Sequence, residues 1–164
     1  MNYSLEGRTA IITGASQGLG LAIARAYVKA RCSVLVCARN RDALESARNE
    51  LSALAARGQK VIALKGDVSR EADAERIVKT ALDHFAQLHI LVNNAGVYGP
   101  KGTIEEADWA AWKDAMQINV MGSVYLCRLV LPHMKSHGYG KIVQLSGGGA
   151  TNPLPRISAF ATSN

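Results

Sequence analysis

Residues 13–20 have the types and the spacing that a phosphate-binding turn needs. They read TGASQGLG, follow a short apolar run that predicts a strand, and begin a segment that predicts a helix. Glycines allow a tight turn and a close approach of the backbone to a ligand, and the N-terminus of a helix offers N–H groups and a partial positive charge. An ordinary glycine-rich turn has the same composition, but the position between a strand and a helix favours a pyrophosphate site.

The residues at the end of the second predicted strand distinguish between the two nicotinamide dinucleotides that a pyrophosphate site could hold, NAD(H) and NADP(H). Proteins that bind NAD usually place an acidic residue there, which accepts a hydrogen bond from the ribose 2′-hydroxyl. This sequence has Ala38 followed by Arg39. A carboxylate would repel a 2′-phosphate, whereas a guanidinium pairs with it through two hydrogen bonds. The pair therefore favours NADP(H) over NAD(H); the alternative is that Arg39 is a solvated surface residue.

Polar residues also lie at the ends of the later predicted strands. Asp67 follows the third strand, Asn93 ends the fourth, and Ser146 follows the fifth. Each of them has a plain structural alternative as a cap, a turn or a loop residue. Asn119 lies inside a predicted helix, where asparagine is locally unfavourable, so we expect a tertiary role for it.

The positions of these candidate site residues are set by an alternation of short apolar strands and amphipathic helices. Apolar runs predict strands over residues 9–13, 33–38, 60–64, 89–93 and 141–145. Apolar residues at helical spacing predict helices over 19–30, 41–57, 71–86 and 108–134, with Pro132 as a candidate break, and another helix from Ser158 onward.

The strand runs do not alternate with polar residues, which is typical of strands buried on both faces. Helices between consecutive strands imply right-handed crossovers and a parallel sheet. The predicted fold is therefore α/β, a Rossmann-type doubly wound parallel sheet that is incomplete, with about five strands. Residues 1–164 are expected to form a single dinucleotide-binding domain, as a fragment of a longer domain.

The composition agrees with one globular domain. The chain has 164 residues, of which 48% are hydrophobic and 20% are charged. The sequence has no apolar run near the roughly 18 residues of a membrane span, and its start lacks a signal-peptide pattern. We therefore expect a cytoplasmic protein with no membrane partner. Cys32, Cys37 and Cys127 lack the spacing of metal ligands, so no metal site is expected.

The formal net charge of +6 raises the question of a nucleic-acid partner. However, the basic residues form no adjacent run, and aromatic residues that could stack on bases make up only 5% of the chain. A small ligand that carries phosphate explains a local excess of positive charge equally well. We therefore expect a small-molecule partner and no nucleic acid.

Taken in order, these segments resemble the short-chain dehydrogenase/reductase family over residues 5–164. The motifs that carry the resemblance are Thr-Gly-x-x-x-Gly-x-Gly at 13–20, Asp67-Val68, Asn-Asn-Ala-Gly at 93–96, Ile-Asn-Val-Met-Gly at 118–122, and Ser146. The resemblance implies an oxidoreductase that transfers a hydride between the nicotinamide of NADP(H) and a carbonyl or alcohol substrate. It implies cofactor contacts at Gly14, Ser16, Gln17, Gly18, Leu19, Gly20, Arg39, Asp67, Val68, Asn93, Ala95 and Gly96.

The resemblance places Ser146 and Asn119 in the family's catalytic set, but the set is not complete. The family's tyrosine and lysine fall on Phe160 and Asn164. Phenylalanine has no acidic proton, and asparagine has no positive charge that could lower the pKa of a phenol. The alternatives are therefore a catalytically inactive NADP(H)-binding or regulatory protein, and a non-functional enzyme fragment.

The family's sheet continues beyond the fifth strand, so the resemblance predicts an unpaired edge along residues 141–145. Unpaired apolar edges recruit other chains. We therefore expect the chain to form a homo-oligomer or to associate with an intact paralogue.

Overall fold

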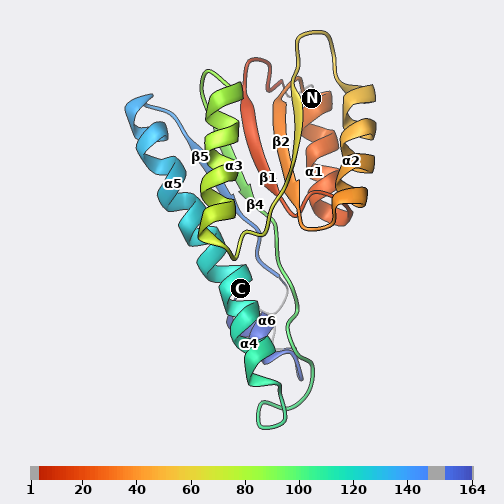
Figure 1. The fold of residues 1–164 in the computed structure, drawn as a ribbon, viewed down its shortest axis with the longest axis vertical. Coiled ribbons are helices and arrows are strands. Elements are labelled where there is room, and N and C mark those ends of the chain that lie inside the picture. Colours follow the sequence, from red (N-terminus) through yellow and green to blue (C-terminus); the bar gives the residue numbers. More distant parts are fainter. Residues whose placement is uncertain (1–3, 148–153, 164) are drawn as a thin grey trace.

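A computed structural model describes residues 4–147 and 154–163 and contains one parallel β-sheet flanked by helices (Figure 1). The sheet has the order β3-β2-β1-β4-β5. Its strands are β1 (Thr9–Thr13), β2 (Ser33–Ala38), β3 (Val61–Lys65), β4 (Ile90–Asn93) and β5 (Lys141–Gln144). The helices that follow them are α1 (Gly18–Lys29), α2 (Arg41–Leu54), α3 (Glu71–His84), α4 (Trp109–Met116), α5 (Gly122–Ser136) and α6 (Ser158–Thr162).

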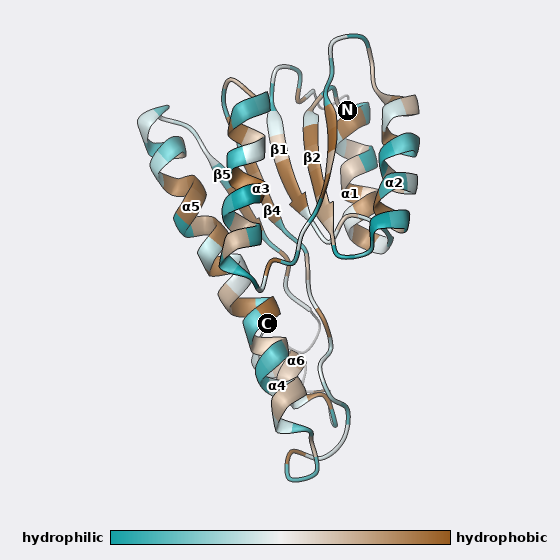
Figure 2. Ribbon diagram, in the orientation of Figure 1, coloured by the Kyte–Doolittle hydropathy of each residue, from teal (hydrophilic) through white to brown (hydrophobic). Residues whose placement is uncertain are grey.

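Two helices cover each face of the sheet. Helices α1 and α2 lie on one face and α3 and α5 on the other (Figure 1). Successive residues of a strand point to opposite faces. Ile12 of β1 therefore packs in one core cluster with residues of α1 and α2, and its neighbour Ile11 packs in the second cluster with residues of α3 and α5. The apolar strands lie between these helices (Figure 2). The predicted Rossmann-type doubly wound architecture is confirmed.

The second helix is shorter than its sequence pattern predicts. The pattern continues to residue 57, but α2 ends at Leu54 and Ala55 is extended. The cause is Gln59, whose side-chain oxygen accepts a 2.7 Å hydrogen bond from the N–H of Ala56. Its amide nitrogen donates to the carbonyls of Val28 and Cys32. These contacts with distant residues hold the loop in a non-helical path.

The predicted helix over 108–134 consists of three joined parts and continues past its candidate break. Helix α4 leads into a π-helical turn, η1 (Gln117–Met121), and then into α5. Pro132 lies inside α5 and does not end it. A proline removes one main-chain hydrogen bond, but Val130 and Met134 on either side of it are buried in the core cluster that α5 shares with α3. This packing keeps the helix continuous.

Burial on both faces holds for β1, β2 and β4 but not for the other two strands. Strand β3 is half-buried along most of its length, and all four residues of β5 are exposed. Both strands stand at the edges of the sheet among the described residues, so each has a neighbouring strand on one side only. The prediction that every strand is buried on both faces was therefore wrong for β3 and β5, because a local apolar pattern does not tell a central strand from an edge strand.

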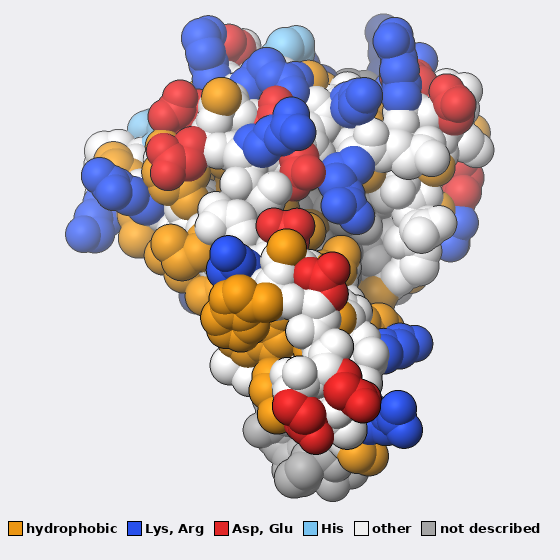
Figure 3. Space-filling model, turned by 60° about the horizontal axis from the view of Figure 1, so that its bottom comes forward, with side chains coloured by type: hydrophobic (Ala, Val, Ile, Leu, Met, Phe, Trp, Pro, Cys, Tyr) orange, Lys and Arg blue, Asp and Glu red, His pale blue; other side chains and the backbone are white. Residues whose placement is uncertain are grey.

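On the face shown in Figure 3, most Lys and Arg side chains lie over the broad part of the molecule that contains the sheet, and hydrophobic and acidic side chains lie together on the narrower part. Among the described residues, no helix is both long enough and apolar enough to cross a membrane.

Candidate functional site

A cavity of about 1080 Å³ lies beyond the carboxyl ends of the strands. The strand order reverses between β1 and β4, and doubly wound proteins bind ligands outside such a switch point. The cavity is lined by thirteen residues that the sequence analysis assigned to a site: Gly14, Ser16, Gln17, Gly18, Leu19, Gly20, Arg39, Asp67, Val68, Ala95, Gly96, Asn119 and Ser146.

Glycine is required at two positions near the turn from β1 to α1, at Gly14 in the loop and at Gly20 in the first turn of α1. Gly14 has a φ of +63°, and a Cβ there would lie 2.8 Å from the Cα of Ala95. A Cβ on Gly20 would overlap the side-chain amide of Asn94 and the carbonyl of Gly14. No side chain of the described residues caps the start of α1. Gly18, Leu19 and Gly20 at the start of this helix line the cavity, so its first N–H groups, left without a side-chain cap, suit an anion there.

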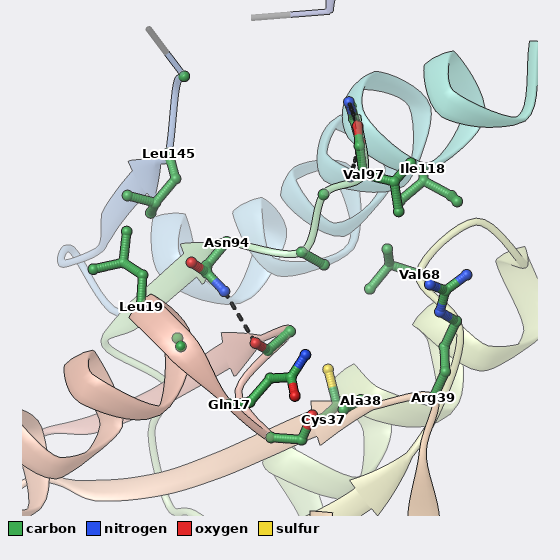
Figure 4. Close-up of a pocket in the computed structure, with 18 of the residues that line it drawn as sticks. Gln17, Leu19, Cys37, Ala38, Arg39, Val68, Asn94, Val97, Ile118 and Leu145 are labelled. Carbon is green, nitrogen blue, oxygen red and sulfur yellow. Dashed lines mark hydrogen bonds between the residues drawn. The ribbon is translucent and has the colours of Figure 1, made fainter. Parts of the chain in front are cut away.

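Asn94 joins the loops that follow β1 and β4. Its side-chain nitrogen donates to the carbonyl of Thr13 at 2.9 Å and to that of Gly14 at 3.1 Å (Figure 4). In return, the Thr13 hydroxyl oxygen accepts 3.0 Å hydrogen bonds from the N–H groups of Asn94 and Ala95. The two loops are thereby fixed relative to one another across the base of the cavity.

Asn93, the preceding residue, does not line the cavity. It is buried, and its side-chain nitrogen donates to the carbonyl of Ser123 on α5 at 3.3 Å. Side chains alternate between the two faces along a strand, so Asn93 faces α5 while Asn94 faces the first loop.

The end of β2 presents a cation to the cavity and no acidic group. Ala38 stands at the strand end, and the exposed Arg39 follows it. Asn40 then starts α2 by accepting a 2.9 Å hydrogen bond from the N–H of Ala43. In the close-up, the guanidinium of Arg39 extends toward the loop that carries Val68 (Figure 4). Among the described residues, no carboxylate lies within ion-pairing distance of this guanidinium.

The loop after β3 holds Asp67 in a fixed turn. One oxygen of this carboxylate, Oδ1, accepts hydrogen bonds from the N–H of Ser69 at 3.0 Å and from its hydroxyl at 2.7 Å. The N–H of Asp67 donates to Asp73 at 2.9 Å. A hydrogen bond from Arg76 and this N–H hold the pKa of Asp73 below its usual value. The second oxygen of Asp67 makes no hydrogen bond within the described residues and is available to a ligand.

A close approach between α5 and this loop sets the position of Val68. A Cβ on Gly122 would lie 2.6 Å from the carbonyl oxygen of Val68. Glycine is therefore required at the start of α5, and the contact brings the Asp67 loop to the edge of the cavity.

Asn119 connects the cavity to α6. It lies in the π-helical turn η1 and is 7% exposed. Its amide exchanges two 2.9 Å hydrogen bonds with the backbone of Val97, and its nitrogen also donates to the hydroxyl of Ser163 at 2.7 Å. Such π-helical turns frequently occur at functional sites. The tertiary role expected of this helical asparagine is thus to join the loop after β4 to α6.

Phe160 occupies the end of the cavity near Ser146. Both residues line it, and a Cβ on Gly147 would overlap the Phe160 ring. The same ring packs on Tyr98, with ring centroids 4.6 Å apart. An aromatic pair therefore forms this wall, and the ring at position 160 carries no hydroxyl. Asn164 lies outside the described residues.

The cavity also includes Phe160, which the sequence placed at the position of the family's tyrosine, and twelve residues that were not assigned to a site from the sequence. These twelve are Cys37, Ala38, Asn40, Gly66, Asn94, Val97, Tyr98, Ile118, Gln144, Leu145, Gly147 and Ser163. Asn94 could have been found from its motif, since it stands beside Asn93. Most of the others carry no local signal because they reach the cavity only through the fold. Burial raises the pKa of the Cys37 thiol to about 12, so this thiol is protonated at neutral pH.

The sheet, the loop and the cavity together define the class of protein. A parallel sheet that reverses its strand order beside a glycine-rich loop, with a cavity at that point, is a Rossmann-type α/β protein. A family model described as short chain dehydrogenase matches residues 8–164. The chain belongs to the short-chain dehydrogenase/reductase family of oxidoreductases.

Individual relatives agree with this assignment. An 11-beta-hydroxysteroid dehydrogenase from Pinus massoniana is 37% identical over 157 residues, which are 95% of this chain and 43% of the relative. A metagenomic short-chain oxidoreductase solved in complex with NADP has a TM-score of 0.89 and 28% identity, over 97% of this chain and 71% of the other. A family member from Burkholderia phymatum, solved in complex with NAD, has a TM-score of 0.91 and 28% identity, over 98% and 56%. The chain spans about half the length of the curated relatives it matches.

Proposed function

We propose that this chain binds NADP(H) in preference to NAD(H), as an oxidoreductase domain whose relatives include both NADP- and NAD-bound proteins. The observation that carries the preference is Arg39 at the cavity edge, after Ala38, with no carboxylate of the described residues paired to it. A 2′-phosphate would meet a guanidinium there, and an unphosphorylated ribose would find no acidic acceptor.

The residues present fit a dinucleotide. A Cβ at Gly14 or Gly20 would fill the space that the glycines leave open beside the backbone, and the uncapped start of α1 suits a pyrophosphate. We assign the adenine end to Asp67, whose second carboxylate oxygen can accept a hydrogen bond from an amino group. The loop of Ala95 and Gly96 would hold the nicotinamide half. When bound, the nicotinamide supplies or accepts a hydride, and the substrate is a small carbonyl compound or alcohol.

The proton that must accompany a hydride has no evident donor on α6. In this chain the Ser146 hydroxyl can hydrogen-bond a substrate oxygen, but the ring of Phe160 has no proton to give. The amide of Asn119 is already bonded to Val97 and Ser163. This observation favours a second candidate function, in which the chain binds NADP(H) without turnover and acts as a regulatory protein or as a partner of an intact paralogue.

A cytoplasmic location and a homo-oligomeric state belong to the same proposal. The three cysteines are all free, which agrees with a reducing compartment. Fractionation of cells that express the natural protein tests the location.

Fluorescence titration with NADPH and with NADH tests the cofactor preference. We expect NADPH to bind more tightly by about 10- to 150-fold, because a charge-assisted hydrogen bond contributes about 1.5–3 kcal/mol. Arg39→Ala should lose this preference. The matched control is Arg48→Ala, which removes an exposed arginine of α2 outside the cavity and should keep it. Equal affinities of the unmodified chain for both cofactors would refute the proposal.

A further inference from the structure

Two histidines hold main-chain N–H groups at the end of the sheet opposite to the cavity. The N–H of Thr9, at the start of β1, donates to Nδ1 of His89 at 3.2 Å. The N–H of Leu88, just before β4, donates to Nε2 of His133 on α5 at 3.0 Å. Leu88 is fully buried and His89 is 7% exposed. Two imidazoles thus join β1, the start of β4 and α5. The last turn of α5 and the start of β5 lie at this same end of the sheet (Figure 1).

Both hydrogen bonds require neutral rings. A ring nitrogen that accepts a hydrogen bond carries no proton, so His89 is the Nε2-protonated tautomer and His133 the Nδ1-protonated tautomer. The Thr9 hydroxyl lies 3.1 Å from Nδ1 of His89, but it donates to the carbonyl of Gln87. If either acceptor nitrogen were protonated, its own N–H would point at the main-chain N–H that now donates to it. The hydrogen bond would then be lost, because two donors would face each other.

The surroundings of the two rings also oppose a positive charge. The ring of His137 is stacked on that of His133 with centroids 4.1 Å apart. Arg8 lies 4.3 Å from the centroid of the Tyr139 ring, which contacts His89 edge-on at 5.7 Å. On the adjoining strand β5, the ammonium of Lys141 lies 5.9 Å from the same Tyr139 ring.

The pKa of each histidine responds to this environment. Burial lowers the pKa of His89, and the charges of Arg8, His133 and His137 lower it further. The pKa of His133 is lowered by burial and then by His137. Each ring is therefore more difficult to protonate in the folded chain than in the unfolded chain.

We propose that His89 and His133 form an acid-sensitive latch, which holds β1 and β4 to α5 while both imidazoles are neutral and releases this end of the sheet when they are protonated. The unfolded chain takes up protons as the pH falls below about 6.5, the ordinary pKa of histidine. The stability that the latch provides is thus fully present above that pH and is lost as the pH falls toward the lowered pKa values of the folded state.

Urea unfolding as a function of pH tests the latch with two variants that keep an acceptor but do not titrate. His89→Asn places an amide oxygen near the position of Nδ1, and His133→Gln places one near Nε2. Each histidine should raise the unfolding equilibrium constant of the unmodified chain by up to about tenfold per pH unit below pH 6.5. Together the two histidines should contribute up to about a hundredfold per pH unit, and the double variant should lose this contribution. The carboxylates contribute equally to the pH dependence of the unmodified chain and of the double variant.

The control is His84→Gln, which replaces an exposed histidine of α3 outside the latch and should leave the pH dependence unchanged. A double variant that retains the full dependence of the unmodified chain overturns the proposal. If the variants do not fold, nitrogen-15 NMR of the unmodified chain decides the matter. We expect the two stated tautomers at pH 7.5 and a pKa below 6.5 for both rings; the opposite tautomer or a charged ring at neutral pH contradicts the latch.

Discussion

The side-chain amide of Asn94 donates a 2.9 Å hydrogen bond to the main-chain carbonyl of Thr13, across 81 positions of sequence. This bond joins the carboxyl ends of β1 and β4, the two strands between which the sheet order reverses. The cavity that we assign to NADP(H) lies directly beyond these strand ends, so its shape depends on this pair.

Asn94→Ala should weaken both the fold and the binding of NADPH. It removes the bonds to the carbonyls of Thr13 and Gly14, and a buried group left without its partner costs about 1–3 kcal/mol. Urea unfolding and NADPH titration measure the two effects. Asn49→Ala, an exposed asparagine of α2, is the matched control and should change neither. Unchanged affinity in Asn94→Ala would show that the bond does not shape the site.

Gly20→Ala should disturb the loop between β1 and α1. It should do so even though Gly20 lies in α1 and alanine is the best helix former. A Cβ at this position would overlap the amide of Asn94 and the carbonyl of Gly14, so one of the two loops must move. Overpacking of this kind costs about 1–3 kcal/mol, and we expect NADPH affinity to fall at least about tenfold. Ala22→Ser, at an exposed position two residues further into α1, serves as the control. A variant with normal affinity and stability would contradict the close approach.

The unmodified chain should show no measurable NADPH oxidation over a broad panel of carbonyl compounds. Loss of a general acid costs about 10² to 10⁴ in rate, and Phe160 has no proton to transfer. NADPH titration of the same sample checks that the fold is intact, so that absent turnover reports on chemistry. Turnover in the family-typical range of about 1–10³ per second would show that another residue supplies the proton.

The exposed edge strand β5 should cause the chain to self-associate at high concentration. Within the part of the chain that the structure describes, β5 has a neighbouring strand on one side only. Ile142 and Val143 are 38% and 40% exposed, and an unpaired apolar edge accepts a strand from another molecule. Val143→Lys should shift the chain toward monomer in light scattering, because edge charges block strand pairing. Val124→Lys introduces the same charge on α5, where the side chain is 59% exposed. A stable monomer, or dissociation caused by Val124→Lys alone, would contradict an interface at β5.

Much of the site follows from local sequence alone. The apolar runs place the ends of all five strands to within one residue, and the glycine spacing of residues 13–20 marks the loop between β1 and α1. Strand length, helical period and turn composition are properties of neighbouring residues, so they can be read without the fold. The charge of Arg39 and the missing hydroxyl of Phe160 are likewise properties of single residues.

Tertiary structure alone decides which side chain faces which neighbour. The sequence does not tell that Asn94 faces the cavity while Asn93 faces α5, because the face depends on the register of β4 in the sheet. It does not tell that β5 is exposed, because burial depends on the strand's place in the sheet. The pairing of Leu88 with His133 spans 45 positions. Contacts of this kind form only once the chain has folded, since no local pattern specifies a partner that lies so far along the chain.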